Sequence, residues 1–106
     1  MGAYEYNPLS IDIPAEILPI EYSLEYPYPN PFNPKTSILF SIPKQSQTSI
    51  KVYDIKGNLI STLLNEPLNI GHHQIEWNAE GYPSGLYFVK MIANSFTKTQ
   101  KLMLIK

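Results

Sequence analysis

Few side chains in this sequence could carry out acid–base or metal chemistry. The only histidines, His72 and His73, are adjacent in a stretch that alternates between polar and apolar residues as a strand does. Neighbouring side chains on a strand point to opposite faces, so the pair cannot bind one metal ion together in regular geometry. The chain contains no cysteine, which removes thiolate ligands, thiol nucleophiles and disulfides. We interpret the histidines as solvent-edge residues at the start of a strand.

The carboxylates offer no catalytic or metal-binding pattern either. Asp54, Glu66, Glu76 and Glu80 lack the spacing of an EF-hand loop or of a paired acid and base. The glycines stand singly at predicted turns and form no phosphate-binding loop. Catalysis needs a nucleophile, a base and a charge-stabilising group in one pocket. We therefore predict no enzymatic activity, no cofactor and no metal site, with a loop-bound calcium ion as the alternative left open.

Charge and hydropathy narrow the range of partners. Eight basic and nine acidic residues give a formal net charge of −1 over 106 residues. No broad electrostatic field therefore exists to attract nucleic acid or an anionic membrane. No apolar run reaches the roughly 20 residues that span a bilayer. We predict no nucleic-acid partner and no membrane span.

Short alternating segments separated by turn residues predict strands. Thr36–Ile42 places Ile38, Phe40 and Ile42 on one face, and Lys56-Gly57-Asn58 supplies residues for a hairpin turn. Leu86–Ala93 is a nearly continuous apolar run, which predicts a central strand buried on both sides. A loop is expected through Pro67 and Gly71. The remaining predicted strands are Thr48–Ile55, Leu59–Leu64, His72–Trp77 and Phe96–Ile105.

Together these segments predict one all-β domain. With a first strand near Tyr22, where the fold is expected to begin, these six make seven strands, which are typical of an immunoglobulin-like antiparallel β-sandwich, with a closed barrel as the alternative. Trp77 is in phase with Ile75 and is expected in the core. Residues 1–21 are interrupted by three prolines and sustain neither the helical nor the strand period, so they are interpreted as a linker. The predicted domain is residues 22–106.

Three local signatures are more specific than the strand pattern. The first is Tyr28-Pro29-Asn30-Pro31-Phe32-Asn33-Pro34, the second is Gly85-Leu86-Tyr87, and the third is the pair Lys101 and Lys106. With Val52-Tyr53-Asp54-Ile55-Lys56-Gly57 between the first two, this order resembles the type A C-terminal sorting domain of the bacterial type IX (Por) secretion system. The resemblance covers about Tyr22 to Lys106.

The resemblance implies an immunoglobulin-like fold and a role as a secretion signal. In that family the domain is the last part of an exported protein, and the outer-membrane translocon reads it after transit through the periplasm. A sortase then commonly removes it, and the cargo is released or joined to anionic lipopolysaccharide at the cell surface. The domain would be a monomeric substrate of this machinery rather than an enzyme. Carried over by motif, the recognition residues are Tyr28, Pro29, Asn30, Pro31, Phe32, Asn33, Pro34, Gly85, Tyr87, Lys101 and Lys106.

The start of the chain fits a fragment of a longer protein. Gly2-Ala3-Tyr4-Glu5-Tyr6 resembles the closing segment of extracellular parallel β-helix proteins. Under this interpretation Met1–Tyr6 is a remnant of the cargo, and Asn7–Glu21 is the linker in which the sortase cuts.

Each motif also has a purely structural interpretation. The prolines would stiffen the chain while Asn30 and Asn33 bond nearby backbone, Gly85 and Tyr87 would shape the core, and the terminal lysines would guard an exposed strand. The alternative function is an immunoglobulin-like or fibronectin-like module that binds carbohydrate or protein at the cell surface. A band of aromatic side chains on one sheet face would favour that alternative.

Overall fold

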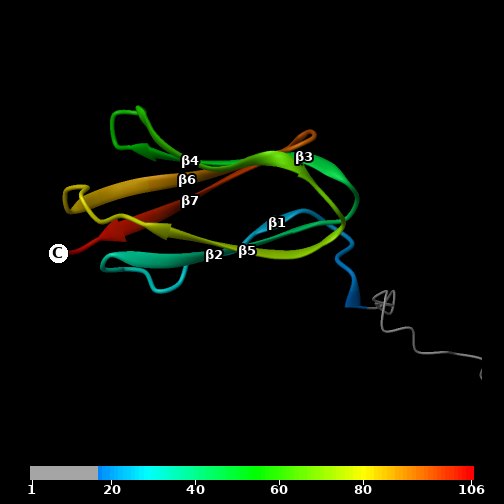
Figure 1. The fold of residues 1–106 in the computed structure, drawn as a ribbon, viewed down its shortest axis with the longest axis horizontal. Coiled ribbons are helices and arrows are strands. Elements are labelled where there is room, and N and C mark those ends of the chain that lie inside the picture. Colours follow the sequence, from blue (N-terminus) through cyan, green and yellow to red (C-terminus); the bar gives the residue numbers. More distant parts are fainter. Residues whose placement is uncertain (1–16) are drawn as a thin grey trace, which may run out of the picture.

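The protein is a sandwich of two antiparallel β-sheets in the computed structural model, which describes residues 17–106. One sheet has three strands in the order β1-β2-β5, and the other has four in the order β4-β3-β6-β7. Figure 1 shows the sheets as two layers, with the C-terminus at the end of the sandwich where β2 begins. The strands are β1 (Ser23–Leu24), β2 (Lys35–Ile42), β3 (Ser46–Asp54), β4 (Leu59–Leu68), β5 (Gly71–Asn78), β6 (Gly85–Ala93) and β7 (Phe96–Leu104). The predicted all-β sandwich of seven strands is confirmed.

Alternating apolar residues from both sheets form one core. Ile38, Phe40 and Ile42 of β2 are buried, as are Ile50 and Val52 of β3. Every second side chain of a strand points to the same face, so these residues meet between the layers. The faces predicted for these two strands are confirmed.

The predicted strand bounds differ from the observed ones by one or two residues in β2, β3, β5, β6 and β7, and by four at the end of β4. β4 continues past Leu64 to Leu68, so Pro67 lies in a strand rather than in the predicted loop. β4 is an edge strand of its sheet, where a proline is tolerated because one side of the backbone needs no ladder partner. β7 ends at Leu104 rather than at Ile105.

The prediction that residues 86–93 are buried on both sides is wrong. β6 is an inner strand of the four-stranded sheet, but only its inward side chains are buried. These are Tyr87, Val89, Met91 and Ala93. Phe88 and Lys90 point the other way and are half-buried, because the second layer packs on one face of the sheet alone. The other sheet does not cover the outer face (Figure 1), where Leu86 and Phe88 are half-buried and Ile92 is exposed.

Asp54 organises the turn between β3 and β4. Its carboxylate accepts hydrogen bonds from the backbone N–H groups of Lys56 and Asn58, both at 2.9 Å, and from the Asn58 side-chain amide at 3.2 Å. Gly57 has a φ of 86°, a conformation that favours glycine. The hydrogen bonds, above all the one from the Asn58 backbone, hold the pKa of the Asp54 carboxyl below its ordinary value. The predicted hairpin turn is confirmed.

Tyr22 fixes the chain just before β1. Its ring stacks on Phe96 with 5.3 Å between the ring centroids. Its hydroxyl is hydrogen-bonded to Ser46 Oγ at 3.1 Å and accepts a hydrogen bond from the Asn94 side chain at 2.8 Å. The bond with Ser46 lowers the pKa of the Tyr22 phenol.

The division into a linker at 1–21 and a domain at 22–106 stays a prediction. The proposed cargo remnant and most of the linker lie outside the described residues. Within residues 17–106, no helix is long and apolar enough to cross a membrane.

Candidate recognition site

The proline-rich signature connects β1 to β2 of the three-stranded sheet, and this connection, the crossing segment, pairs with the four-stranded sheet on the way. Tyr28 exchanges two backbone hydrogen bonds with Ser37 of β2, at 3.0 and 2.9 Å. Phe32 then donates its N–H to the Met103 carbonyl at 2.9 Å and accepts from the Ile105 N–H at 3.0 Å. These bonds form an isolated parallel bridge with β7. The first signature therefore pairs with the strand that carries the third.

Prolines suit a segment that runs between the two sheets. Between two sheets a backbone N–H has no ladder partner, and an unpaired buried N–H is costly. Pro29, Pro31 and Pro34 have no N–H to satisfy, and the peptide bonds before all three are cis. The carbonyl of Pro29 accepts from Thr36 Oγ1 at 2.7 Å, and that of Pro34 accepts from the Ala79 N–H at 2.7 Å. The crossing segment is thus an integral part of the sandwich.

Asn30 joins the crossing segment to β7 through its side-chain amide. Its Nδ2 donates to the Lys101 carbonyl at 3.0 Å, and its Oδ1 accepts from the Met103 N–H at 3.0 Å. The amide therefore satisfies backbone groups that would otherwise be unpaired on an edge strand. Asn30 bonds backbone 71 residues away, not the neighbouring residues expected of a turn residue.

Phe32 packs into an aromatic cluster that also contains the second signature. Its ring centroid lies 5.5 Å from that of Trp77, which in turn lies 5.4 Å from Tyr87 in an edge-to-face contact. Phe32 is 2% exposed and Tyr87 is 4% exposed. Aromatic pairs in these geometries contribute stability beyond the area they bury. The cluster ties the crossing segment to the core.

The second and third signatures lie on neighbouring strands. Gly85-Leu86-Tyr87 of β6 pairs with residues 102–104 of β7. Beyond the end of β7, the Lys106 N–H donates to Ser84 Oγ at 3.1 Å. All three signatures consequently meet at one end of the sandwich, where Figure 1 places the C-terminus.

Burial divides the predicted recognition residues into three groups. The exposed ones are Tyr28, Pro29, Pro31, Asn33, Lys101 and Lys106. The half-buried ones are Asn30, Pro34 and Gly85. Phe32 and Tyr87 are enclosed in the core and can act on a folded partner only by positioning the others.

A hollow of about 200 Å³ opens where the signatures meet. Its lining residues are Tyr26, Asn30, Leu86, Lys101, Leu102 and Met103. Sequence reasoning did not single out Tyr26 or Met103. Met103 could have been found from its spacing, because it shares the outer face of β7 with Lys101. An apolar wall with one amide and one cation suits the docking of a peptide segment.

Burial raises the pKa of the Tyr87 phenol, with the nearby Asp54 carboxylate adding to the effect. The phenol therefore stays neutral and donates a hydrogen bond to the Pro83 carbonyl. This contact links β6 to the loop before it, so Tyr87 has a structural part in the second signature.

The histidines lie on the other sheet. His72 is exposed, whereas His73 is half-buried with its ring stacked on Phe40 at 5.3 Å between centroids. A ring nitrogen of His73 is hydrogen-bonded to the Asn69 carbonyl at 2.9 Å. The two side chains face opposite sides of β5, as predicted. Among residues 17–106, no three His, Cys, Asp or Glu side chains are grouped so as to hold a metal ion.

Comparison with known proteins agrees with this convergence of motifs. Residues 27–106 match the family model described as the secretion system C-terminal sorting domain, so the chain belongs to this family of sorting domains. The family is the sorting domain of type IX secretion.

A solved structure from Porphyromonas gingivalis is also similar. It is described as PorZ, an essential bacterial surface component of the type IX secretion system. The similarity has a TM-score of 0.54 at 25% identity and covers 76% of this chain and 11% of that chain. A comparison with curated proteins found no match.

Proposed function

We propose that this domain is the address that the type IX outer-membrane translocon reads on a longer cargo protein. The observation that supports the proposal is the convergence of the three signatures around one hollow at one end of the sandwich. Asn30 and Lys101 line that hollow, although they are distant in sequence. A partner at this end would contact all three signatures together only in the folded domain.

The translocon contacts would be made by the exposed members of the signatures. Phe32 and Tyr87 are buried, so their part is to hold the crossing segment and β7 in place. Pairing by Phe32 and Asn30 also occupies part of the β7 edge, which supports a monomer because an unpaired edge is what promotes strand-to-strand association.

Removal by a sortase would follow recognition. We place the cut between residues 7 and 21, after which the cargo would be released or joined to anionic lipopolysaccharide at the cell surface. Ile17 and Ile20 are 58% and 87% exposed, so the chain just before the sandwich is open to a protease. Tyr22 anchors the chain immediately afterwards, so a cut upstream would leave the sandwich intact.

The test is export of a reporter. The 106-residue chain is fused behind a signal peptide and a fluorescent reporter, in a bacterium with a working type IX system. We expect the reporter at the cell surface or in the medium, and in the periplasm when the translocon is deleted. A known sorting domain serves as the positive control. Periplasmic reporter in both strains, while the control passes, would overturn the proposal.

The terminal lysines allow a sharper test of the motif. Replacing Lys101 and Lys106 with alanine removes two exposed cations without touching the core. We expect weaker export of the reporter and unchanged folding, measured by circular dichroism. Unchanged export would show that these lysines are not part of the recognition surface.

The alternative function, a binding module, has one observation in its favour. Tyr53 of β3 and Phe88 of β6 are cross-strand partners on the outer face of the four-stranded sheet, which places two aromatic rings next to each other. The reporter experiment separates the two functions, because a binding module would not depend on the translocon for its location.

A further inference from the structure

The outer face of the four-stranded sheet carries two lysines opposite each other, and packing of the core does not explain this pair. Lys51 of β3 and Lys90 of β6 are direct cross-strand partners, and both are half-buried on this face. Like charges directly opposite each other destabilise a sheet. Lys90 is followed across the sheet by Thr99 of β7, which brings no compensating charge.

A third cation lies in the adjacent row of the same face. Tyr53 of β3 pairs with Phe88 of β6, and Phe88 pairs with Lys101 of β7. Three lysines thus surround two aromatic side chains within two neighbouring rows of the sheet. Lys101 also lines the hollow at the meeting point of the three signatures, so this face is continuous with the candidate recognition site.

No carboxylate neutralises these lysines from their own face. In the described part of the chain, the outward positions of β3, β6 and β7 carry no Asp or Glu. Asp54 is the nearest acid along β3, and its oxygens already accept hydrogen bonds from the turn at Lys56 and Asn58. Glu76, in contrast, is exposed on β5 of the other sheet.

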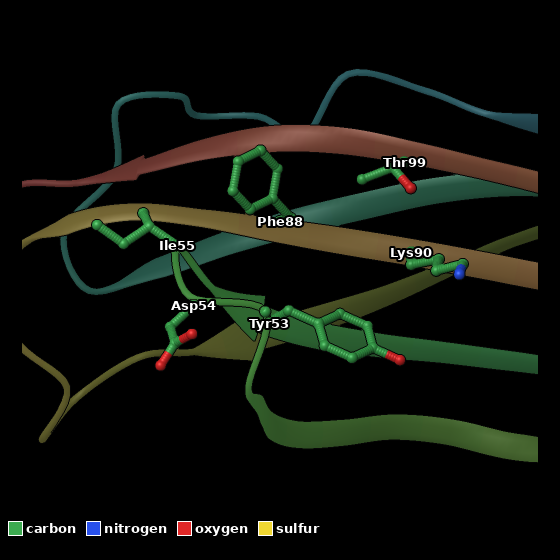
Figure 2. Close-up of a pocket in the computed structure, with 7 residues that line it drawn as sticks. Tyr53, Asp54, Ile55, Phe88, Lys90 and Thr99 are labelled. Atoms are coloured by element: carbon green, nitrogen blue, oxygen red, sulfur yellow. The ribbon is translucent and has the colours of Figure 1, made fainter.

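A hollow of about 320 Å³ on this face is lined by Tyr53, Ile55 and Phe88, by one of the lysines, Lys90, and by Asp54, Gly57 and Thr99. Figure 2 shows Ile55 and Asp54 to one side of Phe88, with Lys90 and Thr99 to the other. Ile55 is 69% exposed although it is a large apolar residue. A hollow with apolar walls and a cation at its rim fits an apolar side chain flanked by carboxylates.

We propose that this face docks an acidic protein surface of the export machinery, which places an apolar side chain between Tyr53, Ile55 and Phe88 and its carboxylates over Lys51 and Lys90. The proposal rests on the proposed function, since it identifies the face that the translocon contacts. A protein fits better than an anionic glycan, because the exposed Ile55 and the Phe88 ring give the hollow apolar walls, which need an apolar side chain as their partner. An acidic protein surface supplies both the apolar side chain and the carboxylates.

The first test reverses the charge of the face in the reporter fusion. The variant K51E/K90E keeps two like charges opposite each other, so cross-strand repulsion stays similar while the sign changes. We expect about tenfold less exported reporter, which is the effect of losing about 1.4 kcal/mol of binding. The matched control K44E/K98E makes the same change in net charge at two exposed lysines outside the signatures and should export normally. Circular dichroism of each purified variant establishes that it is folded.

The outcomes separate this proposal from the one on which it rests. If the native fusion is not exported, the sorting function itself fails. If the native fusion and K51E/K90E are exported equally, the sorting function stands and the docking face is wrong. Equal loss in both double variants would assign the effect to net charge and also overturn the docking face.

The second test distinguishes protein from glycan as the occupant. A photo-crosslinking amino acid replaces Thr99 at the exposed rim of the hollow, and a matched probe replaces Leu39, which is 43% exposed on the other sheet. A protein adduct at position 99 that needs the translocon, with none at 39, supports the proposal. Absence of that adduct, or calorimetric binding of polygalacturonate that K51E/K90E abolishes, would overturn it.

Discussion

The side-chain oxygen of Asn30 accepts a hydrogen bond from the backbone N–H of Met103 at 3.0 Å, across 73 residues of sequence. The same amide donates to the Lys101 carbonyl, so one side chain takes the place of a neighbouring strand at the end of β7. This contact links the proline-rich signature to the terminal one. It explains how motifs at opposite ends of the domain could form a single surface.

Replacing Asn30 with alanine should loosen the end of β7. Two hydrogen bonds disappear, and each is worth about 0.5–1.5 kcal/mol, so we expect a loss of about 1–3 kcal/mol in the free energy of unfolding. Hydrogen exchange should accelerate at the Met103 amide. The exposed Asn33 provides the control, since Asn33→Ala is expected to change stability by less than about 0.5 kcal/mol. Unchanged exchange at Met103 in Asn30→Ala would show that the amide does not hold the strand.

Replacing Phe32 with alanine should destabilise the whole sandwich. The ring is 2% exposed and contacts Trp77, and removing a buried phenylalanine costs about 3–5 kcal/mol. Urea unfolding can be followed by fluorescence of the single tryptophan. The half-buried Phe88 on the outer face is the matched control, and Phe88→Ala should cost clearly less. Equal losses would mean that the crossing segment is not anchored through the core.

Acid should weaken the turn between β3 and β4. Hydrogen bonds from the turn lower the folded-state pKa of Asp54 relative to its ordinary value. A lowered folded pKa contributes stability that is fully present above the unfolded pKa and is lost as the pH falls through the folded one. The contribution is therefore expected near neutral pH and should fade below about pH 4.

The variant Asp54→Asn isolates this effect. We expect its melting temperature to be below that of the native protein at pH 7 and to approach the native value as the pH falls through the folded-state pKa of Asp54, where the native side chain also becomes neutral. Thermal melts across this range make the comparison. A difference that is constant with pH would show that ionised Asp54 does not stabilise the turn.

Burial could be predicted from the sequence where apolar and polar residues alternate along a strand. The inward faces of β2 and β3 followed from alternation alone, and Trp77 was correctly placed in the core. The predicted burial of residues 86–93 on both sides failed because an apolar run has the same composition whether its outer face is covered or is kept for a partner. Lys90 within that run was the available signal that one face meets water.

Contacts between segments that are distant in the sequence could not be predicted from the sequence. Nothing in the residue types near Asn30 indicates that its amide bonds β7, because that partner is set by how the crossing segment lies between the two sheets. The motifs could be named from sequence, but their meeting at one end depends on the strand order. Pro67 illustrates the same limit, since a proline predicts a loop unless its strand is known to be an edge.

A single charge reversal on the outer face should make the domain more stable. Lys51 and Lys90 are direct cross-strand partners, so Lys51→Glu replaces repulsion by attraction. For a half-exposed pair we expect a gain of about 0.5 kcal/mol in the free energy of unfolding. A domain of this size would then melt about 2–4 °C higher, and added salt should reduce the gain because it screens the pair.

The double variant and a control at Lys98 complete the measurement. K51E/K90E restores two like charges and should lose the gain, so a double-mutant cycle gives the coupling between the two positions. The exposed Lys98 pairs with Met91 rather than with a cation, and Lys98→Glu should leave the melting temperature nearly unchanged. If Lys51→Glu is no more stable than the native protein, the lysine pair carries no repulsion. A more stable Lys51→Glu that is also exported less well would show that the native pair serves binding at the expense of stability.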